Sequence, residues 1–366
     1  MREPGLVPGL LALIATSAAP VDDAGVRDLL RLQRLDQRVE TVGYRLAQSA
    51  GTLCPEQVPL TGIAVQDLSA YGGASQADAK RAFGLGSEPA ILAVARGSPA
   101  ERAGLRIGDA LVAIDGEAVP AAPRASATYQ RVAAVEDSLD RHAAEGALDL
   151  DIRRGGASFR LHIDLERGCA SHFQVRPSDA IDAGADGHYV EITSAYVERA
   201  SSDDGLAIVL AHELAHNILH HRGKLDAAGV HRGLLQDFGR SARLTRATEI
   251  EADRLSLYLL DRAGFSLEEA VRFREDLWRG SWDLLRSATH PSGAERLAVL
   301  RAEMARIRAS KATSALPEAA PSSLFRTINT DRTGTGEMSR FLLSCEKARL
   351  GFAPHRFAQC DGWARI

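Results

Sequence analysis

Residues 202–223 read SDDGLAIVLAHELAHNILHHRG, and this stretch decides how the chain is interpreted. Ser202 is a favoured helix N-cap residue, and Gly223 after the apolar run predicts where the helix ends. On a helix, side chains four residues apart lie on one face, so His212 and His216 can direct two imidazole nitrogens at one ion. The stretch therefore predicts a helix with a buried side that carries two metal ligands.

Glu213 follows the first of these histidines directly. A zinc ion lowers the pKa of a coordinated water from about 16 toward 7, and a neighbouring carboxylate can then take a proton from that water. The His-Glu-x-x-His pattern on a helix is typical of zinc-dependent hydrolysis of peptide bonds. We therefore expect one Zn²⁺ per chain and Glu213 as the general base.

A second acidic segment supplies the rest of the expected site. Glu249 and Asp253 share one face of a predicted helix that continues to Gly264. One carboxylate can bind zinc while the other accepts the free N–H of a zinc-bound histidine, so we expect Glu249 as the third ligand and Asp253 behind it. Glu251 falls on the opposite side and is expected to be solvated. The alternative is a solvated acidic stripe on a surface helix.

Three segments together carry a family resemblance: HELAH at 212–216, EIEADR at 249–254 and THPSGAER at 289–296. They resemble the gluzincin family of the CAAX-prenyl endopeptidase and the HtpX heat-shock protease, and more narrowly its soluble, BepA-like periplasmic branch. The resemblance implies an α+β fold whose catalytic domain is mainly helical and zincin-like, with a small edge sheet. It also implies Glu249 as a zinc ligand and Asp253 as its support.

Two further roles come from the same resemblance. The segment GHYVEIT at 187–193 corresponds to an edge strand along which an extended substrate pairs its backbone. His290 belongs to the His-Pro segment near the metal, where it polarises the substrate carbonyl or takes the fourth zinc position. The alternative for His290 is a structural residue at the entry of a helix, ahead of Pro291 at the first helical position. Both interpretations of His290 remain open.

Residues 91–100 (ILAVARGSPA) and 103–116 (AGLRIGDALVAIDG) resemble a bacterial PDZ domain of the HtrA type. They predict a strand, a helical turn that starts at Ser-Pro, and a strand between two turns, followed by a helix and two more strands. Such domains bind extended peptides by strand addition, with loop amides holding the carboxylate. That loop is expected at Phe83, Gly84, Leu85 and Gly86. The alternative is a spacer or lid that binds no peptide.

Composition and the first residues bear on partners and compartment. The 366 residues suffice for two or three globular units, and a net charge of −4 without basic clusters argues against nucleic-acid binding. The apolar stretch from Leu6 to Ala19 follows Arg2 and ends in small residues, which is typical of a cleaved signal peptide. No other run approaches the 18 or so apolar residues that span a bilayer. We expect a periplasmic or secreted protein that does not span the membrane.

Four cysteines add a prediction that fits export. Cys54 and Cys169 bracket the PDZ-like insertion, and Cys345 and Cys360 lie together near the C-terminus. The two ends of an inserted domain must lie near each other, so we favour the pairs Cys54–Cys169 and Cys345–Cys360. The alternative is four buried thiols, which an oxidising compartment disfavours.

The predicted organisation has five parts: a signal peptide at 1–19, a helical part of the peptidase at 20–56, the PDZ-like domain at 57–168, the catalytic domain at 169–310, and a linker with a small appendage at 311–366. The expected function is an endopeptidase that hydrolyses unfolded or misassembled envelope proteins, with the PDZ-like domain capturing peptides, gating access or contacting envelope proteins. The alternative is a non-catalytic periplasmic chaperone or peptide-binding protein with a latent zinc site.

Overall fold

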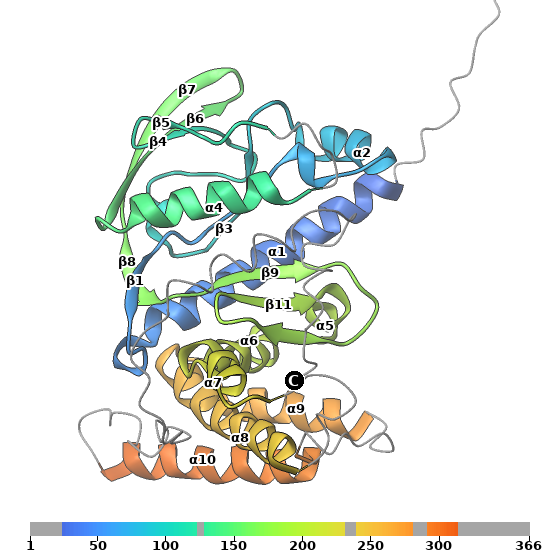
Figure 1. Cartoon of the computed structure of the whole chain (residues 1–366), viewed down its shortest axis with the longest axis vertical. Coiled ribbons are helices and arrows are strands. Elements are labelled where there is room, and N and C mark those ends of the chain that lie inside the picture. Colours follow the sequence, from blue (N-terminus) through green and yellow to red (C-terminus); the bar gives the residue numbers. More distant parts are fainter. Residues whose placement is uncertain (1–23, 123–127, 231–238, 281–290, 314–366) are drawn as a thin grey trace, which may run out of the picture.

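The structure, a computed structural model, describes residues 24–122, 128–230, 239–280 and 291–313. The predicted signal peptide, His290 and the pair Cys345–Cys360 lie outside the described residues. Figure 1 shows a β-rich part and a helical part joined along one long helix, α1 (Ala24–Ser49). The chain therefore has the predicted α+β fold, in which a mainly helical region accompanies a β-rich PDZ-like region.

The β-rich part is built on a six-stranded sheet with its own apolar core. The strand order is β2-β3-β4-β6-β7, and β5 pairs with β4. Its strands are β2 (Ile63–Gln66), β3 (Ala90–Val94), β4 (Ala110–Ile114), β5 (Glu117–Ala118), β6 (Ala147–Arg154) and β7 (Ala157–Asp164), and its helical segments are η2 (Leu68–Ala70), α2 (Ala74–Phe83), α3 (Pro99–Arg102) and α4 (Gln130–Ala143). Gly155 and Gly156 take positive φ values of 56° and 84° in the tight β6–β7 turn. The predicted Ser-Pro helical turn is α3, capped by Ser98.

The helical part surrounds a second core to which α1 contributes Val39, Val42 and Leu46. A three-stranded sheet covers one side of this core. Besides α1, the helical part contains β9 (His172–Arg176), β10 (Ala183–Ala185), β11 (Tyr189–Thr193), α5 (Ser194–Arg199), α6 (Asp203–Ile218), α7 (His221–Ala227), α8 (Gly239–Arg262), α9 (Leu267–Gly280) and α10 (Gly293–Thr313). Helix α6 packs against α8, α9 and α1.

The strand within 187–193 is not an edge strand, so that prediction is wrong. Strand β11 lies in the middle of its sheet, parallel to β9 on one side and antiparallel to β10 on the other. All five of its residues are buried, which is typical of a central strand. Among the described residues, β10 pairs only with β11 and packs against α6, so β10 is the edge on the side of that helix.

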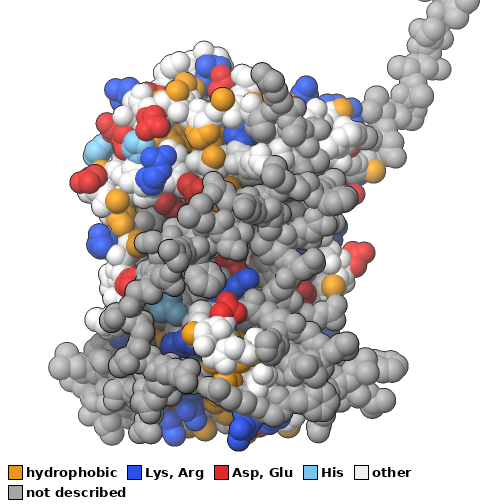
Figure 2. Space-filling model, in the orientation of Figure 1, with side chains coloured by type: hydrophobic (Ala, Val, Ile, Leu, Met, Phe, Trp, Pro, Cys, Tyr) orange, Lys and Arg blue, Asp and Glu red, His pale blue; other side chains and the backbone are white. Residues whose placement is uncertain are grey.

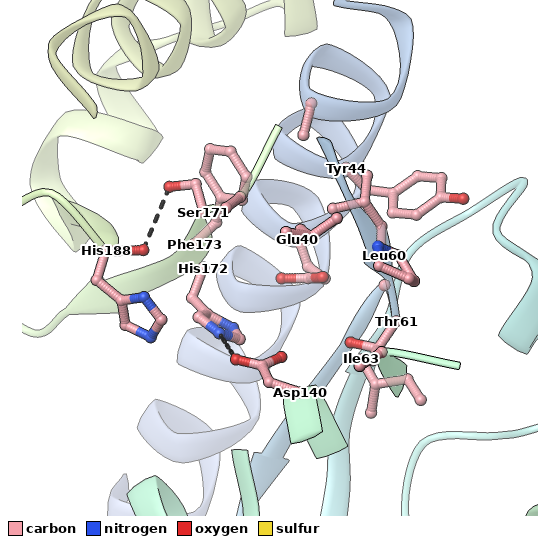
Figure 3. A pocket seen from close by; sticks show the side chains of 16 residues that line it. Glu40, Tyr44, Leu60, Thr61, Ile63, Asp140, Ser171, His172, Phe173 and His188 are labelled. Carbon is pink, nitrogen blue, oxygen red and sulfur yellow. Dashed lines mark hydrogen bonds and ion pairs between the residues drawn. The ribbon is translucent and has the colours of Figure 1, made fainter. Parts of the chain in front are cut away.

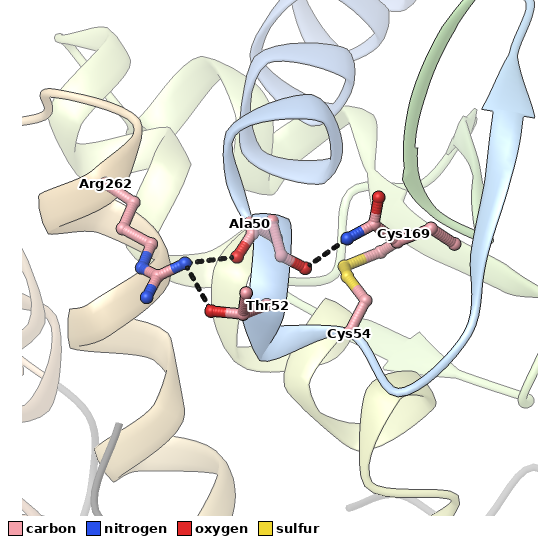
Figure 4. The surroundings of a disulfide bond; sticks show 7 residues. Ala50, Thr52, Cys54, Cys169 and Arg262 are labelled. Carbon is pink, nitrogen blue, oxygen red and sulfur yellow. Dashed lines mark hydrogen bonds between the residues drawn. A yellow bond between two sulfur atoms is a disulfide. The ribbon is translucent and has the colours of Figure 1, made fainter. Parts of the chain in front are cut away.

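Two paired strands carry the chain into and out of the β-rich part. Strand β1 (Gln57–Leu60) leads into the β-rich part and β8 (Glu166–Cys169) leads out, and the two pair antiparallel with Gln57 opposite Cys169. The structure forms the predicted disulfide between Cys54 and Cys169, whose Cα atoms are 5.5 Å apart (Figure 4). The 3-10 turn η1 (Gly51–Leu53) beside it is tied to α8, because Arg262 donates to the carbonyl of Ala50 at 2.9 Å.

Two helix ends differ from the predictions. Helix α6 ends at Ile218, because His220 adopts a left-handed conformation with φ 51° and the chain turns into α7. Gly223 therefore lies inside α7 and does not end the helix. Helix α10 continues to Thr313, so the first three residues of the part predicted as linker and appendage, 311–366, are helical.

No helix among the described residues is both long and apolar enough to cross a lipid bilayer. On the face shown in Figure 2, acidic and basic side chains of the described residues are interspersed over the β-rich part.

Candidate metal centre

Helix α6 places the two histidines in the interior. Ser202 caps the helix by accepting a hydrogen bond from the N–H of Gly205 at 3.2 Å. A side chain at Gly205 would approach the ring of Phe273 to about 3.0 Å, so glycine permits close packing against α9. Every residue of α6 from 205 to 218 is buried. His212 and His216 are therefore held in a dry environment, at 4 % and 3 % exposure.

Helix α8 brings Glu249 and Asp253 to the same place. It packs along α6, and its buried side includes Ala252, Leu255 and Leu259. The side chains of Glu249 and Asp253 are buried beside the imidazoles, at 0 % and 1 % exposure. The alternative of a solvated acidic stripe does not hold for these two carboxylates.

The spacing of the donor atoms fits a metal ion. His212 Nε2 lies 3.2 Å from His216 Nε2 and 3.6 Å from Glu249 Oε2, and His216 Nε2 lies 3.4 Å from Glu249 Oε1. In a tetrahedral site with zinc bonds of about 2.0–2.1 Å, neighbouring donor atoms lie about 3.3 Å apart. The three side chains thus have the composition and spacing of a His2Glu site.

Asp253 and Arg296 flank this group, and Arg296 also lies 3.2 Å from His212 Nε2. Asp253 Oδ1 is 3.0 Å from His212 Nδ1, which leaves Nε2 facing the other two donors. Arg296 from α10 forms a two-pronged ion pair with Asp253, at 2.7 Å for each bond, and lies 2.9 Å from Glu249. The sequence alone indicates no role for Arg296, because this residue follows Glu249 by 47 positions and no local pattern links the two.

Arg296 also fixes the charge of both carboxylates. Burial works to raise the pKa of Glu249, but Arg296 and the two histidines outweigh it and hold that pKa well below its usual range. Burial likewise opposes ionisation of Asp253, and Arg296 together with His212 holds its pKa below the ordinary value. Both groups are therefore carboxylates at neutral pH, which is the form that binds metal and accepts imidazole N–H bonds.

A second chain of contacts lies behind His216. His221 Nδ1 is 2.9 Å from His216 Nδ1, and His221 Nε2 is 3.1 Å from Glu251 Oε2. The expectation that Glu251 is solvated is wrong: its side chain is only 21 % exposed and bonds to His221. The reason is the turn at His220, which returns His221 toward α8. Burial lowers the pKa of His221 well below its ordinary value, so this ring is neutral and accepts the N–H of His216.

Glu213 is buried next to these ligands. Its Oε2 has no hydrogen-bond partner among the described residues. Its charge contributes to raising the pKa of Tyr196 on α5, after the larger effect of burial. A buried carboxylate oxygen of this kind is costly unless it meets water or substrate, so Glu213 is suited to proton transfer.

The predicted peptide-binding loop lies apart from this centre, at the end of α2. Phe83 is the last residue of α2, and Gly84 takes a left-handed conformation in which its N–H donates to Lys80. Leu85 is buried in a small apolar cluster with Ala79 and Ala90. The amide of Gly84 is therefore used by the helix end, and a role for residues 83–86 in holding a carboxylate stays a prediction.

Comparison with known proteins agrees with these observations. Residues 170–235 and 225–304 match the family model of peptidase family M48, and residues 91–138 match that of a PDZ domain. No curated protein matches the chain. The M48 match includes both helices that carry the buried His2Glu group, and the PDZ match lies within the six-stranded sheet region. The chain thus combines a region similar to peptidase family M48 with a region similar to a PDZ domain.

Proposed function

We propose that the protein is a zinc-dependent endopeptidase, in which His212, His216 and Glu249 bind one Zn²⁺ and Glu213 is the general base. The observation that carries the proposal is the spacing of 3.2–3.6 Å between donor atoms of the three side chains, together with the buried, unpaired oxygen of Glu213, which follows His212 directly in the sequence. We also propose that the chain is closest to the soluble, BepA-like branch of the family and that its PDZ domain is of the HtrA type.

A bound zinc ion supplies Lewis acidity, which acidifies a water and polarises the peptide carbonyl. Glu213 accepts the proton that the water loses as it attacks the carbonyl carbon. It then delivers this proton to the amine nitrogen as the peptide C–N bond breaks. Asp253 and His221 hold the two imidazoles so that Nε2 of each faces the shared position.

The substrate is proposed to be an extended polypeptide that pairs with β10. This strand is the edge of the sheet on the α6 side, and an extended chain can add to such an edge by backbone hydrogen bonds. The PDZ domain captures or gates substrate chains. Unfolded or misassembled envelope proteins are the proposed substrates, and the Cys54–Cys169 disulfide supports an oxidising compartment such as the periplasm.

The test compares the full chain with Glu213→Gln, using zinc analysis and cleavage of casein. Because Glu213 is not a ligand, the variant is expected to retain about one zinc per active site and to lose cleavage by at least about 100-fold. Glu145→Gln, an exposed residue of the PDZ region, is the matched control and should cleave as the wild type does. Undiminished cleavage by Glu213→Gln would overturn its role as the general base. Zinc binding without cleavage by the wild type would instead favour a non-catalytic binding protein or chaperone.

A further inference from the structure

Asp140, His172 and His188 meet at the junction between the PDZ domain and the peptidase region, and we refer to them as the junction cluster. Asp140 lies on α4, His172 begins β9, and His188 directly precedes β11. The backbone N–H of His172 donates to the carbonyl of His188 at 3.0 Å, so the parallel strands bring the two histidines together. Three distant segments thus supply two imidazoles and a carboxylate to one place.

The side chains of the cluster are close enough to share one ion. His172 Nε2 is 2.8 Å from Asp140 Oδ2, and the rings of His172 and His188 have centroids 4.8 Å apart. One ligand atom from each of the three residues lies within 4.8 Å of the others. Figure 3 shows Asp140 bonded to His172, with the ring of His188 beside them. For all three to contact one ion, the exposed His188 side chain must turn, and the hydrogen bond between His172 and Asp140 must open to admit the ion.

The surroundings favour a cation. The cluster borders a cavity of about 250 Å³, and the described residues that line it include Glu40 and Asp140 but no Lys or Arg. Figure 3 shows Glu40 from α1 in the same cavity. Glu40 is only 8 % exposed. Asp140 repels an anionic ligand such as a peptide carboxylate and attracts a divalent cation, and Glu40 adds to that attraction in its ionised form.

We propose that the junction cluster binds a divalent transition-metal ion, zinc in particular, at a second site separate from the His2Glu centre. Imidazole nitrogen and carboxylate oxygen are ligands that zinc commonly takes. The three side chains leave a fourth position, which water from the cavity can fill. This inference does not depend on the proposed peptidase activity.

Such an ion would fasten the PDZ domain to the peptidase sheet. Helix α4 already contacts that sheet through Glu136, which accepts a hydrogen bond from Tyr189 of β11 at 2.9 Å. A metal ion bound by Asp140 and His188 adds a link one helical turn further along α4. The second site would therefore set the position of the PDZ domain relative to β11.

The test counts zinc ions bound per untagged full-length chain, by metal analysis after equilibration with zinc and gel filtration. The wild type is expected to hold two ions. His212→Ala combined with His216→Ala should leave one, His188→Ala should leave one, and the triple variant should leave none. Because His188 is exposed, its replacement is not expected to disturb the fold, and a thermal unfolding midpoint within a few degrees of the wild type checks this.

Matched controls distinguish the loss of a metal ligand from the mere loss of a carboxylate charge or an imidazole ring nearby. Asp140→Asn is expected to release the second ion, whereas Asp137→Asn, exposed one turn earlier on α4, should retain it. His142→Ala should also retain it, because His142 is bonded to Asp115 and Glu117. Cobalt(II) absorption tests where the second ion binds. In the His212→Ala, His216→Ala protein, which keeps only the second site, adding His188→Ala is expected to change the cobalt spectrum. A wild type with one ion, or two ions unaffected by His188→Ala and Asp140→Asn, overturns the proposal.

Discussion

Replacing His221 by Phe tests whether the chain His216–His221–Glu251 controls metal binding. His221 is fully buried, and Phe has a similar planar shape, so packing is largely preserved. The substitution removes the acceptor for the Nδ1–H of His216 and the donor to Glu251. Glu251 is 21 % exposed and can turn to water, whereas His216 is buried and cannot. Most of the cost therefore falls on His216.

The magnitude follows from that difference. Leaving a buried donor without a partner costs about 1–3 kcal/mol. The acceptor on His221 favours the His216 tautomer that carries its proton on Nδ1 and leaves Nε2 free for the metal. Without that acceptor, a loss of this size falls on metal affinity, and about 1.4–2.8 kcal/mol corresponds to 10–100-fold weaker zinc binding. Glu251→Gln keeps an acceptor for His221 and is expected to weaken binding by less than about 10-fold.

The assay is zinc affinity from competition with a chromophoric chelator. The matched control is His220→Asn, which removes the neighbouring exposed imidazole and keeps a residue that tolerates the left-handed conformation at φ 51°. His220→Asn is expected to bind zinc as the wild type does. If His221→Phe binds zinc with unchanged affinity, or if both variants lose it equally, then the hydrogen bond to His216 does not position that ligand.

Two further predictions concern stability. Removing the disulfide by Cys54→Ala with Cys169→Ala should lower the free energy of unfolding by about 4.8 kcal/mol, from the chain entropy of a loop with a sequence separation of 115; a loss below about 1 kcal/mol in urea unfolding would contradict this. Burial raises the pKa of Glu40 from its ordinary value of 4.5 to about 7, so the folded state favours the protonated form. The stability that this group contributes is fully present below pH 4.5 and is lost as the pH rises through 7. Glu40→Gln should therefore be neutral near pH 4 and stabilise by up to about 3 kcal/mol near pH 8, and equal melting shifts at both pH values would refute that cause.

The sequence predicted the candidate ligands because helical periodicity is local. His212 and His216 share a face through their spacing alone, and the same holds for Glu249 and Asp253. The partners behind them could not be predicted in this way. His221 turns toward α8 only because His220 takes a left-handed conformation that its sequence does not demand. The apolar run through Leu219 gave no sign of that break.

Tertiary pairing explains the other differences. Whether residues 189–193 form an edge or a central strand depends on Ala183–Ala185, a segment of three small residues with no strand pattern of its own. Arg296 lies on another helix, and only the packing of α10 against α8 brings it to Asp253. The disulfide was predictable because the topology of an inserted domain constrains its two ends, although the residues lie 115 positions apart.

The buried charges of the metal centre supply an argument that does not depend on motifs. Glu213, Glu249 and Asp253 are buried. Arg296 pairs with Glu249 and Asp253, and the buried Arg274 bonds to Tyr196, on which the charge of Glu213 also acts. At formal charges, three negative groups thus face two positive groups, and a buried charge without a partner costs several kcal/mol. We therefore propose that a cation between the imidazoles compensates the excess negative charge, and we expect its removal to loosen the packing of α6 against α8.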